Sequence, residues 1–453
     1  MASKVFIGAG AGFACDRTDA AGPVADTLAS LPGARFLIFE TLAERTLAQS
    51  QLDRRRDAAR GYNPALERFV GPVLARCLRD GIKIIGNFGA ANPSAAAARI
   101  QAMAHAQGLR APRVGVVDGD DLTARLSPAE LAARETGGAV LRNATEIIAA
   151  NLYLGAEPIA QALDQGADIV VTGRVADSAL ALGPLIHTFG WKLDDWGRLA
   201  AGTLAGHLLE CGSQITGGYF ADPPFKTVSG MADLGYPIAE IDPDGGMVIT
   251  KPAATGGRVD RFTVIEQLLY EIHDPSAYLA PDVVLDITDV TVEEVAPDRV
   301  RVTGARGKPA PKATVCVDGG VLGEAEISYA GPNAAARARL AAQTIGERMN
   351  RRAPGLVFRV DAVGVVSVLG DAGGALARPW ACDPGDVRLR FAAQSKIAAE
   401  VELLLDEVEA LYCAGPAGGA GVRKRLTPRL ASASCLIERK YALPRVTLTG
   451  GSP

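Results

Sequence analysis

The chain has 453 residues, of which 48% are hydrophobic and 22% charged, and its formal net charge at pH 7 is −4. This balance is ordinary for a globular protein, and it argues against nucleic-acid binding, which needs a basic surface. No apolar run reaches the length of about 18 residues that a membrane span requires, and the N-terminus lacks a signal-peptide pattern. Seven scattered cysteines without a Cys-x-x-Cys pair predict reduced thiols and a cytoplasmic protein.

Short apolar runs alternate with helical patterns through the first 190 or so residues. Continuous apolar runs of this kind are typical of parallel strands that helices cover on both faces. The sequence therefore predicts an α/β domain over residues 1–280, with a mostly parallel sheet flanked by helices. The predicted strands are 5–9, 35–40, 83–87, 113–118 and 168–172, and the clearest helices are 64–80 and 93–107.

The pattern changes along the rest of the chain. Residues 190–280 look mostly helical with glycine-rich breaks, and residues 281–453 are expected to form a smaller α+β domain. The strands expected there are 283–288, 291–295, 299–303, 313–317, 324–329, 358–369 and 444–448, with helices at 333–351 and 388–413 and a loop at 414–421.

Polar or glycine-rich turns follow all five predicted parallel strands. Ligands of parallel sheets bind beyond the carboxyl ends of the strands, in open sheets and in barrels alike; we favour an open sheet. The sequence therefore predicts a substrate cleft within the first 280 residues. The candidate residues are Gly10, Asp16 and Arg17 after the first strand, Glu40 and Arg45 after the second, Asn87, Ala91 and Asn92 after the third, Asp120 and Asp121 after the fourth, and Gly173, Arg174 and Asp177 after the fifth.

Three of these turns suggest anion or nucleotide binding. The run from Gly8 to Gly12 approaches the Gly-x-Gly-x-x-Gly pattern with its third glycine displaced, so it favours either an NAD site or a tight packing turn. Asn92 precedes a proline and a helix, which suits a capped helix end with or without a bound anion. Arg174 with Asp177 indicates either a carboxylate clamp or a structural ion pair.

Two clusters have residue types suited to metal binding or proton transfer. Asp118, Asp120 and Asp121 place three carboxylates after one strand, so they are predicted to raise one pKa toward that of a general acid, to hold a divalent metal (Asp120 and Asp121), or to form a solvated turn. His207, Glu210 and Cys211 share one face of a predicted helix, so they are candidates for an acid–base pair, a metal site, a cysteine nucleophile or a buried interface.

Several segments resemble the acyclic terpene utilisation family AtuA. The matching words span nearly the whole chain: IGAGAGF with CDR (7–17), FETLAERTLA (39–48), GYNP (61–64), KIIGNFGAANP (83–93), GADIVVTGRVADSALALGPLIH (166–187), DDWGRLAAGTLAGHLLECGSQITGGYF (194–220), TKPAATGGRV (250–259) and EISYAGP (326–332).

The resemblance implies catabolism of branched acids through CoA thioesters, often beside a small partner protein. The leading hypothesis is a lyase or hydro-lyase acting on a branched hydroxy acid or its CoA thioester. His207 or Glu210 would move the proton, with Asp177 and Cys211 as further catalytic candidates, and Arg174 would clamp the substrate. The alternatives are a non-catalytic acyl-CoA-binding or scaffold subunit and an NAD-dependent oxidoreductase. A divalent metal is the one cofactor considered, and a homo-oligomer is the default assembly.

Overall fold

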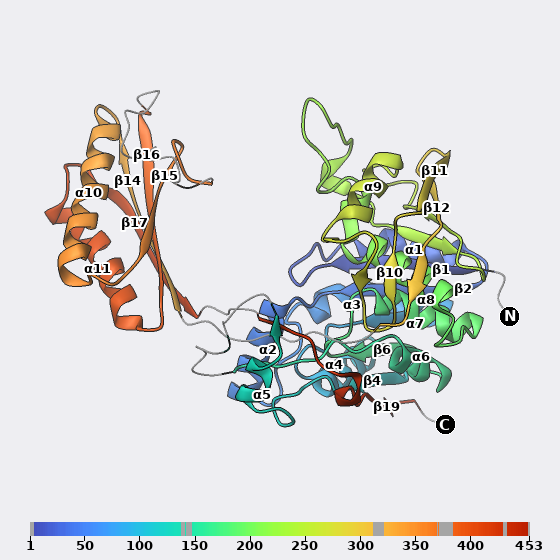
Figure 1. Cartoon of the computed structure of the whole chain (residues 1–453). Coiled ribbons are helices and arrows are strands. Elements are labelled where there is room, and N and C mark those ends of the chain that lie inside the picture. Colours follow the sequence, from blue (N-terminus) through green and yellow to red (C-terminus); the bar gives the residue numbers. More distant parts are fainter. Residues whose placement is uncertain are drawn as a thin grey trace. The chain divides into compact units, whose positions relative to one another are not determined.

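The computed structural model describes residues 4–136, 141, 147–310, 321–368, 370, 384–428 and 433–451. The chain forms two compact units, unit 1 with residues 1–316 and 433–453, and unit 2 with residues 317–432 (Figure 1). This division differs from the boundary at residue 280 expected from the sequence. Unit 1 extends further because β12 (Arg299–Thr303) pairs with β8 (Met247–Thr250), and because β19 (Arg445–Thr449) pairs with β4 (Val114–Asp118).

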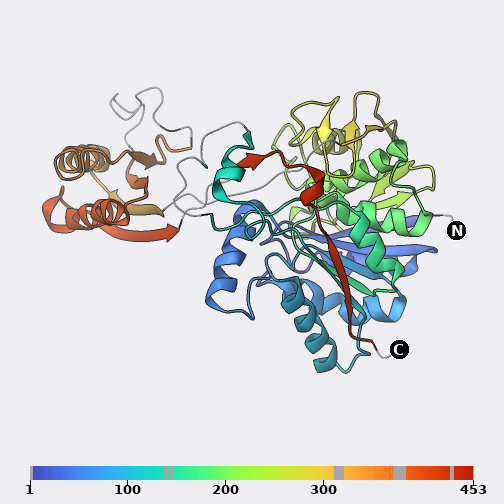
Figure 2. The same cartoon turned by 60° about the horizontal axis from the view of Figure 1, so that its bottom comes forward.

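A ten-stranded sheet in the order β11-β12-β8-β7-β1-β2-β3-β6-β4-β19 forms the centre of unit 1. The sheet is mixed rather than mostly parallel. Its middle is parallel and consists of β1 (Val5–Gly12), β2 (Ala34–Glu40), β3 (Lys83–Gly86), β6 (Ile169–Thr172) and β4. Antiparallel strands flank this middle: β7 (Ile238–Ile241), β8, β12 and β11 (Thr291–Ala296) on one side, and β19 on the other, where Figure 2 shows it running along the sheet.

Helices cover both faces of the parallel middle, as the continuous apolar runs predict. One face packs on α1 (Ala21–Ser30), α3 (Leu66–Asp80) and α4 (Pro93–Ala106) through a core that includes Phe6, Phe39 and Val171. The other face packs on α6 (Glu157–Asp164), α7 (Ala179–Phe189) and α8 (Trp196–Glu210). Strand β4 follows β3 in the sequence but does not pair with it, because β6 lies between the two strands in the sheet. The polar turns after β2, β3 and β6 therefore meet at one edge of the sheet.

Smaller elements complete unit 1. They are α2 (Glu44–Arg56), α5 (Pro128–Ala132), α9 (Arg261–Leu269), the three-stranded sheet β13 (Arg306–Lys308), β10 (Val284–Asp286) and β9 (Tyr278–Leu279), and the pair β18 (Ser434–Cys435) and β5 (Glu135–Thr136). None of the helices in the described part of the chain is long and apolar enough to cross a membrane.

Helices α8 and α9 confirm part of the helical prediction for residues 190–280, but the prediction is wrong at residues 238–250. Strands β7 and β8 form a hairpin there, closed by the turn from Asp242 to Gly246. The hairpin pairs with β1 and with β12, which is why the sheet is mixed. Each strand has only four residues, too few for alternation to reveal it.

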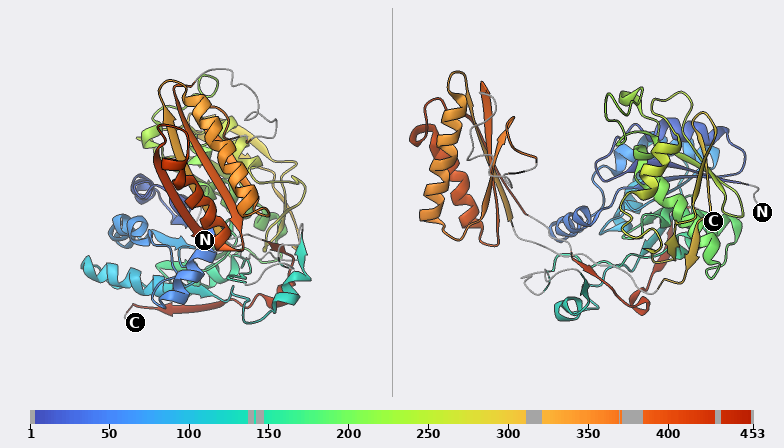
Figure 3. Two further views of the ribbon diagram at one scale, coloured as in Figure 1. Left: turned by 90° about the vertical axis from the view of Figure 1, so that its left-hand side faces the viewer. Right: turned by 45° about the horizontal axis from the view of Figure 1, so that its top comes forward.

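Unit 2 has the βαββαβ arrangement of ferredoxin-like folds. Its antiparallel sheet has the order β15-β16-β14-β17, and helices α10 and α11 lie on one face of it (Figure 3). The elements are β14 (Val321–Ala330), α10 (Ala334–Arg352), β15 (Phe358–Val363), β16 (Asp386–Ser395), α11 (Ala398–Ala414) and β17 (Ala420–Pro428).

The long helix predicted at 388–413 is wrong, because its first part is β16. Val387, Leu389, Phe391 and Ala393 alternate with more exposed residues, and this period of two places them against the helices. Strand β15 is shorter than predicted, and β17, after the expected loop, was not predicted. The strand predicted at 313–317 lies outside the described residues.

Candidate functional site

A cavity of about 530 Å³ opens at the carboxyl ends of β1, β2 and β6, the place where the sequence predicts a cleft. Its size suits a small-molecule ligand. Six of its lining residues carry carboxyl groups, and we call it the carboxylate cavity. The lining residues are Gly12, Phe13, Asp16, Glu40, Leu42, Ala43, Glu44, Arg174, Asp177, Glu210, Cys211, Ser213, Gln214, Gly218, Tyr219, Tyr270 and Glu271.

Arg174, two residues beyond β6, is the cation of this cavity and is only 1% exposed. Its Nε donates to the Val175 carbonyl at 2.8 Å, and its two terminal nitrogens donate to the Leu42 carbonyl and to Asp177 Oδ1. The Tyr153 ring lies against it, with 4.5 Å between the guanidinium carbon and the ring centroid. Burial alone would lower the pKa of Arg174, but neighbouring Asp177 raises it, so the guanidinium stays charged.

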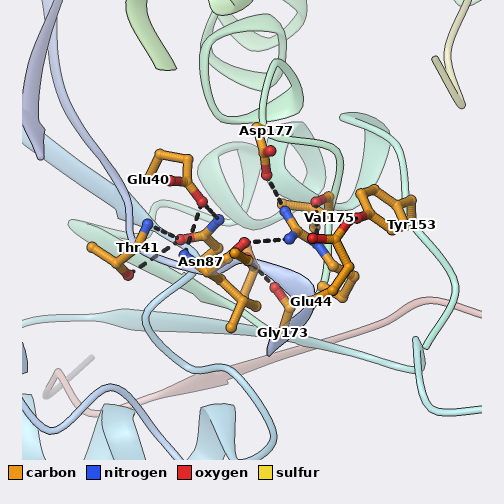
Figure 4. A network of polar contacts seen from close by, with 12 residues as sticks. Glu40, Thr41, Glu44, Asn87, Tyr153, Gly173, Val175 and Asp177 are labelled. Atoms are coloured by element: carbon orange, nitrogen blue, oxygen red, sulfur yellow. Dashed lines mark hydrogen bonds and ion pairs between the residues drawn. The ribbon is translucent and has the colours of Figure 1, made fainter. Parts of the chain in front are cut away.

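These contacts change the role expected for Arg174. All three guanidinium nitrogens have protein partners, so Arg174 orders the loops at the ends of β2 and β6. Figure 4 labels Asp177 and Val175, two of the residues that accept these hydrogen bonds. The geometry favours the structural ion pair with Asp177 over a substrate clamp.

Glu40, at the end of β2, is held in the wall of the cavity by neutral donors. Its Oε1 accepts from the Leu42 amide at 2.8 Å and from Asn87 Nδ2 at 3.0 Å. Asn87 is fixed in turn because its Oδ1 accepts from the Thr41 amide at 2.7 Å (Figure 4). Asn87 therefore fixes the orientation of the Glu40 carboxyl group. Gly173, another candidate, packs closely against Asp120.

Three carboxyl groups of the cavity influence one another. Burial raises the pKa of Glu40, and the charge of Glu210 adds to this effect. The Asp177 side chain is only partly exposed, and the protein around it raises its pKa well above the ordinary value; Arg174 opposes this, whereas the charges of Glu40 and Glu210 reinforce it. Burial and like charge therefore both favour the protonated forms of Glu40 and Asp177.

His207 supports Glu210 from the interior of α8. The two residues lie at positions i and i+3, and His207 Nδ1 is 2.9 Å from Glu210 Oε1. His207 is 1% exposed. Burial acts to lower the pKa of His207, but the Glu210 carboxylate raises it overall. His207 does not line the cavity, whereas Glu210 does, so His207 is a positioning residue for the Glu210 carboxylate.

Cys211 lines the cavity next to Glu210 but lacks the features of an activated nucleophile. Burial raises the pKa of its thiol, and the charge of Glu210 raises it further. A nucleophilic cysteine needs a thiolate, which nearby cations favour. Cys211 is therefore a neutral wall residue at physiological pH.

Asp16 also lines the cavity. Its Oδ2 accepts from the Gly12 amide at 2.7 Å, and its Oδ1 accepts from the Tyr236 hydroxyl at 2.5 Å. The mouth of the cavity is aromatic, since Phe13 and Tyr219 are 55% and 77% exposed.

The glycine run of β1 serves packing. A Cβ at Gly8 would lie 2.3 Å from Val24, one at Gly10 would lie 2.6 Å from the Phe39 ring, and one at Gly12 would lie 2.4 Å from the backbone of Cys211. Helix α1 starts nine residues after Gly12, so its amino end does not directly follow the glycines as in a dinucleotide-binding turn. The geometry thus favours the packing turn over the NAD site.

Four other candidates belong to a second cavity of about 300 Å³, which we call the arginine cavity. Its lining residues are Gln51, Arg54, Ala90, Ala91, Asn92, Pro93, Ser94, Asp118, Gly119, Asp120, Asp121, Ala124, Arg125, Asn151 and Arg445. Asn92 caps α4 by accepting from the Ala95 amide, and its Nδ2 donates to the carbonyls of Ala58 and Arg60.

The arginine cavity does not bring together a metal site. Asp120 Oδ2 accepts from the Arg174 amide at 3.0 Å and from Asn151 Nδ2 at 2.6 Å, and Asp121 Oδ1 accepts from Thr123. Burial raises the pKa of Asp120 to about 6. Among the described residues, no group of three or more His, Cys, Asp or Glu side chains is arranged to hold a metal ion.

The family model for the acyclic terpene utilisation family protein AtuA matches residues 5–448. The chain belongs to this family. No curated protein and no solved structure matches the chain. Membership of the AtuA family agrees with the segments quoted above.

The remaining candidates of this AtuA-family chain lie apart from the carboxylate cavity. Arg17 is paired with Asp19, and exposed Arg45 on α2 does not line the cavity.

The sequence places Glu44 one helical turn beyond the second predicted strand, and the structure brings it into the lining of the cavity, where it accepts from the Tyr153 hydroxyl. Sequence reasoning missed Tyr270 and Glu271 as lining residues. Tyr270 and Glu271 follow α9, and no local pattern marks them. Glu271 adopts the left-handed conformation at φ 59°, which is uncommon for a residue other than glycine.

Proposed function

We propose that this chain is a lyase or hydro-lyase acting on a branched hydroxy acid or its CoA thioester by acid–base chemistry. One observation carries the proposal: Glu40, Asp177 and Glu210 line one cavity together with the buried guanidinium of Arg174. Elimination from a hydroxy acid needs one group that accepts a proton and one that donates a proton. A set of interacting carboxyl groups supplies both at neutral pH.

Asp177 is the proposed general acid, and Glu210 the proposed general base. In elimination of water, Glu210 removes a proton from the carbon next to the carbonyl, and Asp177 protonates the leaving hydroxyl group, which departs as water. In carbon–carbon cleavage, the base instead removes the hydroxyl proton and the acid protonates the carbanion that forms. The same pair of residues serves both reactions, and each cycle ends with the proton transferred back between them.

The surroundings support this assignment. His207 contacts Glu210 through Nδ1, which fixes the orientation of the carboxylate. Arg174 contacts Asp177 on one side only, through Oδ1, and the Asp177 side chain is 35% exposed. The aromatic mouth formed by Phe13 and Tyr219 suits a branched apolar chain.

The test is turnover of branched 3-hydroxyacyl-CoA thioesters and the corresponding free hydroxy acids, followed by mass spectrometry of the products. We expect Asp177→Asn and Glu210→Gln to lower the rate by about 10²–10⁴-fold each, as for loss of a general acid or base. Glu67→Gln is the matched control, because Glu67 is a carboxylate paired with Arg99 on the outer surface of unit 1.

Three outcomes would contradict the proposal. Unchanged rates in both cavity variants would remove the assigned roles. Binding of acyl-CoA without any turnover would favour the non-catalytic acyl-CoA-binding subunit, and turnover that requires NAD would favour the oxidoreductase.

A further inference from the structure

The lining of the carboxylate cavity carries more acid than base. Its six carboxyl groups belong to Asp16, Glu40, Glu44, Asp177, Glu210 and Glu271. Arg174 is the only lysine or arginine among the described residues that line it. With Glu40 and Asp177 protonated, and with His207 offsetting the charge of Glu210, the remaining acids still outnumber this one cation. A ligand with a negative charge of its own therefore meets like charge in this cavity.

The charge of Arg174 is already engaged by the protein. Each of its three guanidinium nitrogens donates to a protein oxygen, and the side chain is 1% exposed. The Tyr153 ring lies against the guanidinium, with its centroid 4.5 Å from the guanidinium carbon. Clamping of a substrate carboxylate needs two parallel hydrogen bonds from an accessible guanidinium. The geometry of Arg174 therefore does not compensate a carboxylate ligand for the acids around it.

The chemistry of proton removal gives an independent reason. When a base removes a proton from the carbon next to a carboxylate, the product is a dianion, whereas removal next to an ester or thioester gives a monoanion. Stabilisation of such a developing charge requires donors or cations aimed at the oxygens that carry it. A cavity in which acids surround one engaged guanidinium suits the monoanion better than the dianion.

We propose that the carboxylate cavity selects the uncharged, thioester form of the branched hydroxyacyl substrate and rejects the free hydroxy acid. This inference rests on the proposed function and narrows its substrate. Glu44 and Glu271 contribute to the selection without belonging to the proposed proton-transfer set. Half-buried Glu44 accepts from the Tyr153 hydroxyl, and exposed Glu271 has no hydrogen-bond or ion-pair partner in the described part of the chain.

The test compares two ligands that differ in charge but hardly in size, 3-hydroxy-3-methylbutanamide and 3-hydroxy-3-methylbutanoate. Ligand-observed NMR titration of the full chain measures both affinities without any turnover. At about pH 7.5 we expect the amide to bind at least about tenfold more tightly, because the acid brings a like charge into the cavity. Between about pH 7.5 and about pH 5.5, the affinity for the acid relative to the amide should rise by up to about tenfold per unit of pH decrease, since the protonated acid is the form that binds.

Matched variants assign the selection to the cavity. Glu44→Gln keeps an acceptor for the Tyr153 hydroxyl but loses the charge, and it should reduce the preference for the amide by at least about threefold. Glu271→Gln should act in the same direction with a smaller effect, because water screens an exposed charge. Glu67→Gln, on the outer surface of unit 1, should leave the preference unchanged.

Three outcomes would overturn the inference: no binding of the amide, binding of the acid as tight as that of the amide, or a preference that Glu44→Gln does not change. Turnover distinguishes these failures from failure of the proposed function. A retained amide preference without turnover of any thioester would remove the function and leave the selection. Turnover of the free acid with the same kcat/KM as the thioester would leave the function and remove the selection.

Discussion

The two units both bury carboxylates, but they neutralise them differently. In unit 2, Glu407 is 2% exposed and accepts from Arg348 and Arg352, on the neighbouring helix. Asp361 is likewise held by two guanidinium groups, from β15 and β16. Each buried acid of this kind has two cationic partners, an arrangement typical of structural ion pairs.

In the carboxylate cavity of unit 1, by contrast, the carboxyl groups outnumber the cations among the described residues. Glu40, Asp177 and Glu210 line one cavity with Arg174 as its single cation. Asp120, in the neighbouring cavity, accepts only from neutral groups. A surplus of carboxyl groups over cations raises the pKa of Glu40 and Asp177, as the proposed proton transfer requires. The comparison therefore agrees with a structural role for the buried acids of unit 2 and with the proton-transfer role proposed for the carboxylate cavity of unit 1.

The largest expected effect on stability concerns Asp120. The pKa of Asp120 in the folded protein, about 6, lies above its ordinary value of 3.8. The protonated carboxyl group therefore adds to the free energy of unfolding, and this contribution is fully present at a pH below 3.8. The contribution is lost as pH rises through the folded pKa. Relative to Asp120→Asn, the wild-type protein should lose roughly 2–3 kcal/mol between about pH 4 and about pH 7.5. Chemical denaturation of both proteins across this range measures the difference; a constant difference would contradict the assignment.

Glu407→Gln should act mainly on unit 2. Removal of the buried charge leaves Arg348 and Arg352 without their partner, but both arginines are about half exposed, which limits the cost to about 1–2 kcal/mol. Hydrogen exchange followed by mass spectrometry should show faster exchange in α10 and α11, with unit 1 peptides unchanged. Equal acceleration in both units would mean that the ion pair does not act locally.

Glu40→Gln should shift a pH profile with less effect on stability. The negative charge of Glu40 raises the pKa of Asp177, so its removal should lower that pKa. If protonated Asp177 is the acid, activity falls as pH rises through this pKa, and the alkaline limb should move to lower pH by about one unit. A limb that moves the other way would exclude Asp177 as the acid. Glu67→Gln again serves as the control for charge.

Cys211→Ser should have the smallest effect. Because burial and Glu210 keep the thiol protonated, we expect the rate to stay within about threefold of the wild-type rate. A loss as large as that expected for Asp177→Asn would show that Cys211 acts as a nucleophile.

The parallel middle of unit 1 could be predicted because each strand is a continuous apolar run between helices. Strands β7 and β8 could not, because each has four residues, and their place in the sheet depends on pairing with distant strands. Strand β16 was mistaken for helix because an amphipathic helix follows it after two residues, Lys396 and Ile397. The alternation of apolar and polar residues over β16 is the signal that distinguishes this strand from the helix that follows it.

The site was partly predictable for the same reason. Glu40 and Asp177 follow predicted strands, and such ends meet at one edge of a parallel sheet. Tyr270 and Glu271 arrive from a loop after α9, so only the tertiary fold brings them there. The sequence also could not show that two backbone carbonyls and Asp177 would accept hydrogen bonds from all three guanidinium nitrogens of Arg174.

The insertion of unit 2 within unit 1 has a consequence for folding during translation. Strand β19 covers the edge of β4, but Asp118 and Arg445, which meet in this pair, are 327 residues apart. At about 5–20 residues per second, the ribosome needs roughly 16–65 s to synthesise the intervening chain. During this time β4 is an uncovered edge strand, which can pair with other chains. The late synthesis of β19 therefore leaves nascent unit 1 open to edge-to-edge association until the chain is complete.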